Sequence, residues 1–311
     1  MSFTTEIKKE ISKNELKDHC LRAELSALIQ LTSSIQISNG SLDLLIRTES
    51  PITAGRIKVL LKERYQDLDH ELVVMQKTNL RKNNIYLLTV RKRANEILSD
   101  LGLYNTKGLL LEHPLYHIIQ KDCCARAYLA GAFLAFGSCN DPSKSDYHLE
   151  ISFMSINHAQ FTIKLLSRFM IEAKFTKRRN KFVVYVKKAD DISDFLRCVG
   201  ASESLMKFED ARIQRDFTNS IVRLNNCEIA NEMKSLKASA EQITDMEKII
   251  KSPRYEVLDE KLKKVIELRL TDRDLSLSEL CVRYEERYGE KISKSGLKHR
   301  LVKIHEIAKG M

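Results

Sequence analysis

An internal repeat constrains this chain of 311 residues more than any single motif does. An offset of 104 residues lays 25–33 (LSALIQLTS) on 129–137 (LAGAFLAFG). A slightly smaller offset lays 85–90 (IYLLTV) on 181–186 (KFVVYV). A duplicated unit of about 100 residues predicts two halves with the same fold, related by pseudo-twofold symmetry.

Both halves show the same order of patterns. A helix rich in small residues is followed by an alternating run, at 42–48 and again at 147–153, which is typical of a strand. A helix with apolar residues at three- and four-residue spacing comes next, and then two strand-like runs and a closing helix. The order predicts an α+β fold for each half.

The run 128–139, YLAGAFLAFGSC, alternates small and large apolar residues and carries no charge. Small side chains let another backbone come close. The run therefore predicts a buried helix in tight contact with a second helix, and by itself it needs no further function.

Positive charge is concentrated in corresponding hairpins of the two halves. The formal net charge is +10, and neither hairpin segment contains an acid. The segment 76–93 carries Lys77, Arg81, Lys82, Arg91, Lys92 and Arg93. The segment 174–188 carries Lys174, Lys177, Arg178, Arg179, Lys181, Lys187 and Lys188. Two such hairpins favour a surface that follows phosphates over the alternative of a merely solvated face.

Cysteine usage and the N-terminal sequence predict a cytoplasmic protein. The seven cysteines include no CxxC pair, which argues against a disulfide framework and a zinc site and favours reduced, mostly structural thiols. The start, MSFTTEIKKEIS, has no apolar signal core, and no run is long enough for a membrane span.

Cofactor and metal motifs are also missing. No Walker or Rossmann glycine pattern is present, so we expect no cofactor. His113 and His117 have the spacing of metal ligands, but Pro114 interrupts the helix and no third ligand is evident, so we expect no metal.

The organisation changes after residue 200. Residues 206–251 have apolar side chains at steps of three or four, which predicts a long helix that joins two domains. Within it lies RLNNCEIAN, at 223–231. Cys227 and Glu228 have no histidine beside them, so a contact between domains is favoured over a catalytic pair.

Three short helices are predicted from residue 258 onward. The first covers 258–270; the second is capped by Ser276 and stops at Gly289; the third begins near Ser293 with Leu297, Leu301 and Ile304 as its core stripe. A basic third helix after a turn is typical of a helix-turn-helix, although three-helix modules that never contact DNA share this pattern. The candidate recognition residues are Lys294, Ser295, Lys298, His299, Arg300 and Lys303.

Residues 129–137 resemble the LAGLIDADG motif of homing endonucleases at its first, second, third, seventh and ninth positions. The resemblance implies two helices packed across a pseudo-twofold axis, strands that form a DNA saddle, and one metal-binding acid near the end of each helix. Those acid positions hold Thr32 and Phe136, and the preceding acidic positions hold Gln30 and Leu134. Cleavage is therefore predicted to be lost and binding kept.

Some acids do lie near the second helix. Asp141, Asp146 and Glu150 follow it in the sequence, but the first half has no matching pair of acids.

The whole chain resembles the WhiA family of bacterial DNA-binding regulators, through SFTTEIKKEI, RLNNCEIAN and LSLSEL followed by SKSGLKHRLVKI. The resemblance implies a degenerate LAGLIDADG-like domain at 1–205, with repeats at about 1–105 and 106–205, a helical linker at 206–252 and a helix-turn-helix domain at 253–311. RYGEK, at 287–291, departs from the family pattern and enlarges the turn before the third helix.

We therefore expect a non-catalytic, nucleoid-associated regulator that binds double-stranded DNA in cell division, chromosome segregation or sporulation. Three alternatives stay open: an active metal-dependent endonuclease, an RNA-binding or maturase-like protein, and an adaptor that contacts RNA polymerase or a sigma factor. The oligomeric state is not determined by the sequence.

Overall fold

The structure, a computed structural model, describes residues 2–38, 41–66, 68–76, 84–105, 107, 109–144 and 146–311. The chain divides into two compact units, Met1–Arg215 and Asp216–Met311. Helix α8 (Ser202–Ile250) begins in the first unit and ends in the second.

The N-terminal unit is built from two halves with the same element order, as the repeat predicts. After α1 (Phe3–Ile11), the first half contains α2 (Asp18–Thr32), β1 (Ser33–Ser38), β2 (Ser41–Thr48), α3 (Pro51–Arg64), β3 (His70–Gln76), β4 (Asn84–Val90) and α4 (Ala94–Asp100). After the short helix η1 (Tyr116–Ile118), the second half contains α5 (Asp122–Phe136), β5 (Gly137–Cys139), β6 (Leu149–Phe153), α6 (Ile156–Ser167), β7 (Lys174–Arg178), β8 (Lys181–Val186) and α7 (Ala189–Cys198).

Each half forms one antiparallel sheet of four strands. The strand orders, β1-β2-β4-β3 and β5-β6-β8-β7, are the same, which confirms the duplicated α+β fold. Buried and less buried residues alternate along β6, because one face of the sheet meets the helices and the other does not.

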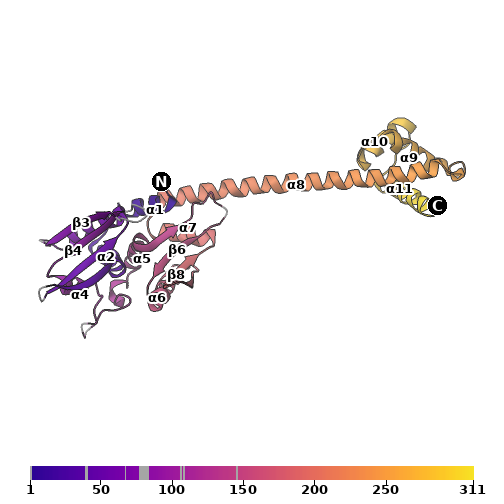
Figure 1. The fold of residues 1–311 in the computed structure, drawn as a ribbon. Coiled ribbons are helices and arrows are strands. Elements are labelled where there is room, and N and C mark those ends of the chain that lie inside the picture. Colours follow the sequence, from indigo (N-terminus) through magenta and orange to yellow (C-terminus); the bar gives the residue numbers. More distant parts are fainter. Residues whose placement is uncertain are drawn as a thin grey trace. The chain divides into compact units, whose positions relative to one another are not determined.

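Helices α2 and α5 lie next to each other in the middle of this unit, with the first sheet beside α2 and the second beside α5 (Figure 1). Gly131 of α5 lies directly against α2: a Cβ atom there would approach the carbonyl oxygen of Glu24 to 2.5 Å. A glycine is therefore needed for the two backbones to come this close. The close helix–helix contact predicted from 128–139 is confirmed.

A buried ion pair lies beside this contact. Glu24 is 1% exposed, and the guanidinium of Arg56 in α3 donates to its carboxylate at 2.7 Å. Arg56 also donates to the backbone carbonyls of Ser12 and Asn14, at 3.0 and 2.9 Å. Burial raises the pKa of Glu24, and Arg56 opposes that shift. The pair thus joins α2, α3 and the segment after α1.

The C-terminal unit is helical and packs around its own core. After α8 and the short helix η2 (Pro253–Tyr255) come α9 (Glu260–Thr271), α10 (Leu277–Tyr288) and α11 (Lys294–Lys309). Met246 and Ile249, near the end of α8, share the core with Leu280 and Tyr284 of α10 and with residues of α9 and α11.

Local signals explain where these helices begin and end. Ser276 and Glu279 form a capping box at the start of α10, and Gly289 ends the helix with a φ of 66°. Ser293 caps α11 by accepting a hydrogen bond from the Gly296 amide. The three short helices and their caps are confirmed where the sequence predicts them.

Two glycine substitutions test the close contact of α2 with α5. We expect Gly131→Ala to lower the free energy of unfolding by about 1–3 kcal/mol, because the new methyl group meets Glu24 backbone that cannot move aside. Far-UV circular dichroism during chemical denaturation of the full chain gives the change.

Gly55→Ala is the matched control. Gly55 lies within α3, and apart from its own helix backbone no described atom lies within 4 Å of the position that a Cβ atom would take there. Alanine favours a helix at such a position, so we expect stabilisation by about 0.5–1 kcal/mol. Equal effects of the two substitutions would contradict a special role for Gly131.

Candidate nucleic-acid interface

The second sheet has basic side chains on the side away from its core. Strand pairing puts Lys174 opposite Tyr185, and Arg178 opposite Lys181. Paired residues share a face and successive residues alternate, so Lys174, Arg178 and Lys181 project from the same side, whereas Ile151 faces the core. These three residues are called the basic face below.

The register separates other basic residues of the same hairpin. Lys177 pairs with Phe182 and therefore projects from the opposite side to Arg178. Arg179, in the tight turn between β7 and β8, has a φ of 55°, in the left-handed region. A positive φ is what a two-residue hairpin turn requires at its first residue. A phosphate contact by Lys177 or Arg179 stays a prediction.

The corresponding hairpin of the first half is only partly described. Lys77, Arg81 and Lys82 lie outside the described residues. Arg91 follows β4, and its guanidinium forms an exposed ion pair with Glu71 at 2.6 Å. Contact of Arg91 with a phosphate would therefore compete with this pair.

The C-terminal ends of α2 and α5 are the positions at which the LAGLIDADG resemblance implies metal-binding acids. Thr32 ends α2, is buried, and donates its hydroxyl to the Leu28 carbonyl at 2.7 Å. Phe136 ends α5 and is 39% exposed, with the Lys181 Nζ 5.4 Å from its ring centre. Neither side chain has a carboxylate that could hold a divalent cation.

The two preceding positions have structural contacts. Gln30 donates to the Leu111 carbonyl and accepts from the Tyr128 hydroxyl, each at 3.0 Å. Leu134 is fully buried, and its backbone carbonyl accepts from the Thr53 hydroxyl at 2.8 Å.

The acids that follow α5 are distributed over separate contacts. Asp141 accepts a hydrogen bond from the Ser143 hydroxyl at 2.5 Å, and Asp146 is exposed. Glu150 pairs with His148 at 3.0 Å and with Arg178 at 3.4 Å. Within the described part of the chain, no group of three metal-ligating side chains includes these acids.

Cationic groups surround the end of α5. A cavity of about 520 Å³ is lined by Lys8, Arg47, Glu49 and Phe136, among others. Burial lowers the pKa of Lys8 to about 8, so this amine still carries its proton at neutral pH. Lys8 and Arg47, with Lys181 over the Phe136 ring, can attract a phosphate. Glu49 is the single carboxylate among the residues that line this cavity, so the cavity does not offer a pair of acids.

In the C-terminal unit, α10 and α11 form the helix pair of a helix-turn-helix. Residues 289–293 connect them, and the enlarged turn is held by Glu290, which accepts from the Lys264 ammonium of α9 at 2.9 Å. Leu297, Leu301 and Ile304 are buried, as predicted for the core stripe of α11.

The side of α11 opposite this stripe is exposed and mostly polar. Among the six predicted recognition residues, helical periodicity puts Ser295, His299 and Lys303 furthest from the core, and all three are exposed. The exposed side chains of Val302 and Glu306 share this side. Lys294 and Lys298 are exposed as well, but they lie toward the α8 side of the helix, where Lys298 lines a cavity with residues of α8. Ser295, His299 and Lys303 are therefore the best-placed of the predicted recognition residues.

Arg300 has a different environment. It is half-buried, and its guanidinium donates to the hydroxyl of the fully buried Tyr284 at 2.9 Å. The same group lies 5.5 Å from the Tyr284 ring centre. Arg300 thus fastens α11 to α10 and is less available for a base contact than its neighbours.

The two histidines with metal-ligand spacing have separate partners. His113 stacks on the Phe161 ring with 4.7 Å between centres, whereas His117 lies 3.3 Å from an Arg22 nitrogen. A group of metal-ligating side chains that the sequence analysis missed lies instead at the N-terminal ends of α2 and α5, and consists of His19, Cys20, Cys123 and Cys124. These residues have no CxxC spacing. The sequence signal that links them is the repeat, because an offset of 104 residues lays 19–20 on 123–124.

Three family profiles match this chain. The WhiA N-terminal LAGLIDADG-like domain matches residues 18–104, the WhiA LAGLIDADG-like domain matches 125–218, and the WhiA C-terminal HTH domain matches 221–308. None of the described helices has the length and apolar character needed to cross a membrane.

Curated relatives and a solved structure agree with these profiles. A protein of Bacillus cytotoxicus named "Probable cell division protein WhiA" is 42% identical over 99% of this chain and 96% of its own length. A relative of the same name from Shouchella clausii is 41% identical over 99% of this chain and 94% of its own length. The crystal structure of full-length DUF199/WhiA from Thermatoga maritima covers 100% of this chain and 99% of its own, with a TM-score of 0.61 and 23% identity, which shows a shared fold. From its domain profiles and relatives, this chain belongs to the WhiA family.

Proposed function

We propose that this chain is a non-catalytic protein that binds double-stranded DNA and regulates transcription in cell division, chromosome segregation or sporulation. The observation that carries the proposal is the end of α5, where cationic groups and Phe136 stand in place of a metal-binding carboxylate. A phosphate can be held there, but the two helix ends lack the pair of acids that two-metal cleavage uses, since they hold Thr32 and Phe136.

Each unit has a separate task in this proposal. Ser295, His299 and Lys303 of α11 read base edges in the major groove, and the basic face of the second sheet contacts phosphates. We assign the first task to a domain at 253–311 and the second to a domain at 1–205, joined by a helical linker at 206–252.

The proposed location in the cell follows from the proposed binding to DNA. A chromosomal DNA site places the protein in the cytoplasm, at the nucleoid. The helix-turn-helix leaves room for a second partner, RNA polymerase or a sigma factor, because only one side of α11 is assigned to DNA.

Charge removal from the basic face tests the phosphate contacts. The logarithm of the DNA-binding constant falls linearly with the logarithm of the salt concentration, and each phosphate contact adds about 0.9 to the magnitude of this slope. We expect the triple variant Lys174→Ala, Arg178→Ala, Lys181→Ala to reduce that magnitude by about 2–3. Fluorescence anisotropy with duplex DNA at several salt concentrations gives the slope.

The matched control is Lys58→Ala, Lys62→Ala, Lys164→Ala. These three lysines are exposed on α3 and α6. The control changes the net charge equally and is expected to leave the slope nearly unchanged. An equal slope for both triple variants would contradict phosphate binding by the basic face.

A substitution in α11 tests sequence readout. We expect His299→Ala to reduce the preference for the bound site over random DNA by roughly 5- to 150-fold, equivalent to about 1–3 kcal/mol for one base contact. The site is first identified by sequencing genomic fragments retained by the protein.

His305→Ala is the control for this measurement. His305 is also exposed on α11 but pairs with Asp245 of α8 at 2.6 Å. If the preference for the bound site over random DNA fell equally in both variants, or fell in neither, His299 would not read a base.

Incubation with supercoiled plasmid tests the absence of catalysis. We expect the plasmid to be retarded but neither nicked nor linearised by the full chain in the presence of Mg²⁺ or Mn²⁺, on native and denaturing gels. Cut strands from protein free of contaminating nuclease would establish the endonuclease alternative, and a preference for structured RNA in competition would establish the RNA-binding alternative.

A further inference from the structure

Four metal-ligating side chains converge at the N-terminal ends of α2 and α5. His19 and Cys20 come from the first turn of α2, and Cys123 and Cys124 from the first turn of α5. One ligand atom from each residue can be chosen so that all four lie within 4.8 Å of one another. We call these four residues the Cys3His cluster.

The internal repeat relates the two halves of this cluster. The offset of 104 residues that aligns α2 with α5 lays 17–20 (KDHC) on 121–124 (KDCC). His19 therefore corresponds to Cys123, and Cys20 to Cys124. The pseudo-twofold contact of the helices brings together two equivalent dipeptides that are far apart in the sequence.

We propose that the Cys3His cluster is a binding site for one zinc ion. Three thiolates and one imidazole form one of the common ligand sets of structural zinc sites. The site is independent of the proposed DNA-binding function.

The distances in the cluster suit tetrahedral coordination. The Nδ1 atom of His19 lies 3.3 Å from the Cys20 sulfur, 3.2 Å from the Cys124 sulfur and 3.9 Å from the Cys123 sulfur. Ligands at zinc–sulfur and zinc–nitrogen distances of about 2.3 and 2.0 Å lie roughly 3.5–3.8 Å apart in a tetrahedron. All four ligand atoms lie within 4.8 Å of one another, so no pair has to close by more than about 1 Å to reach these separations.

The ligand types and their spacing favour zinc over hard cations and iron–sulfur clusters. Hard cations such as Mg²⁺ and Ca²⁺ prefer oxygen ligands, which the cluster does not offer. Ligand atoms within 4.8 Å of one another leave room for a single ion, whereas the iron and sulfide atoms of an iron–sulfur cluster must lie between its ligands. A disulfide would use only two of the four side chains.

Several groups around the cluster favour the charge of the bound form, and the two acids beside it, Asp18 and Asp122, are each paired with an arginine. Binding releases three thiol protons to solvent and leaves a site with a net charge of −1. The N-terminal ends of two helices carry partial positive charge, which stabilises thiolates. Lys17 immediately precedes α2, Lys121 immediately precedes α5, and Arg126 lies one turn further along α5.

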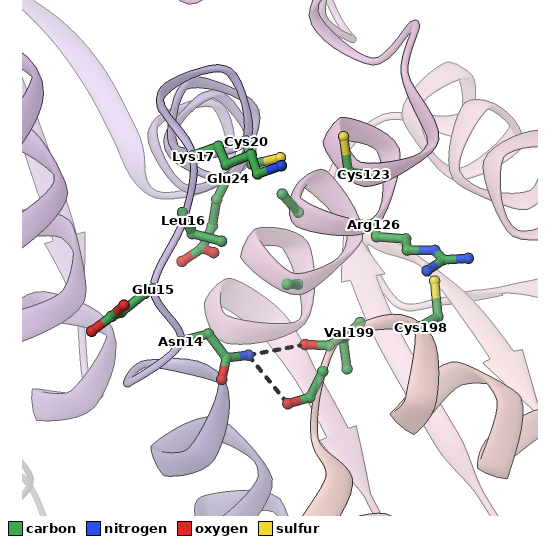
Figure 2. A pocket seen from close by; sticks show the side chains of 13 residues that line it. Asn14, Glu15, Leu16, Lys17, Cys20, Glu24, Cys123, Arg126, Cys198 and Val199 are labelled. Carbon is green, nitrogen blue, oxygen red and sulfur yellow. Dashed lines mark hydrogen bonds between the residues drawn. The ribbon is translucent and has the colours of Figure 1, made fainter.

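An ion can reach the cluster from solvent. Cys20 and Cys124 are buried, but Cys123 is exposed. Cys20 and Cys123 both line a cavity of about 430 Å³, together with Lys17 and Arg126. Figure 2 shows Cys20 next to Lys17, and Cys123 on the neighbouring helix, at the same end of this cavity.

Zinc at this position would fasten the two halves of the N-terminal unit together. Its ligands come equally from α2 and α5, at the ends opposite to Thr32 and Phe136. Since the unfolded chain does not hold these residues together, zinc binds the folded form and stabilises it.

The full chain, purified under reducing conditions without chelator, tests the site. We expect about one zinc per chain by inductively coupled plasma mass spectrometry, and a tetrahedral thiolate spectrum when Co²⁺ replaces zinc. After removal of metal by a chelator, returning zinc to a hundredfold excess over Kd should raise Tm by roughly 5–10 °C.

Cys123→Ser separates ligand loss from misfolding, because Cys123 is exposed and its replacement leaves the core intact. We expect zinc affinity to fall by at least about tenfold. Losing a group that only hydrogen-bonds to a ligand already costs about that much, and Cys123 is a ligand itself. Cys227→Ser, which removes an exposed thiol in α8, is the control and should keep both zinc content and the cobalt spectrum.

Three results would overturn the proposal. One is zinc-free protein in which all three thiols of the cluster react freely and Tm does not change on addition of zinc. The second is a disulfide within the cluster that forms equally well in the presence of zinc. The third is equal loss of zinc in Cys123→Ser and Cys227→Ser, with both variants folded by circular dichroism.

Discussion

The close approach of α2 to α5 at Gly131 is the constraint on which the N-terminal unit depends. Each helix runs directly into the first strand of its own sheet, since α2 ends at Thr32 where β1 begins and α5 ends at Phe136 where β5 begins. The separation of the two backbones therefore determines how the sheets are placed. The buried pair of Glu24 and Arg56 strengthens this arrangement, because a charge deep in the core must keep its partner.

The same contact gives the two ends of the helix pair different chemistry. At the C-terminal ends, the positions of the LAGLIDADG acids hold a hydroxyl that is bonded within its own helix and an aromatic ring beneath an ammonium group. At the N-terminal ends, the contact gathers sulfur and imidazole ligands. In the proposed function, the C-terminal ends of α2 and α5 contact phosphates without a metal. In the zinc proposal, the N-terminal ends bind a metal ion that takes no part in DNA binding.

The C-terminal unit depends on local signals more than on distant contacts. A capping box starts α10, a left-handed glycine ends it, and a serine caps α11. Tyr284 then links the two helices, because its buried hydroxyl accepts from Arg300. These helices are predictable from the sequence, since caps and apolar stripes act over only a few residues.

The sequence by itself determined the duplication, the order of helices and strands, the small-residue contact and the caps and core stripe of the helix-turn-helix. All of these follow from periodicity and from residues close together in the chain. Only the tertiary structure decided that Arg178 lies on the face away from the core and Lys177 on the other, because the pairing register fixes which face of the strand meets the helices. Likewise, only the structure showed that Arg300 is engaged by Tyr284 and that His19 lies beside Cys124. Contacts between residues so far apart in sequence are created when helices pack, and no local pattern encodes them.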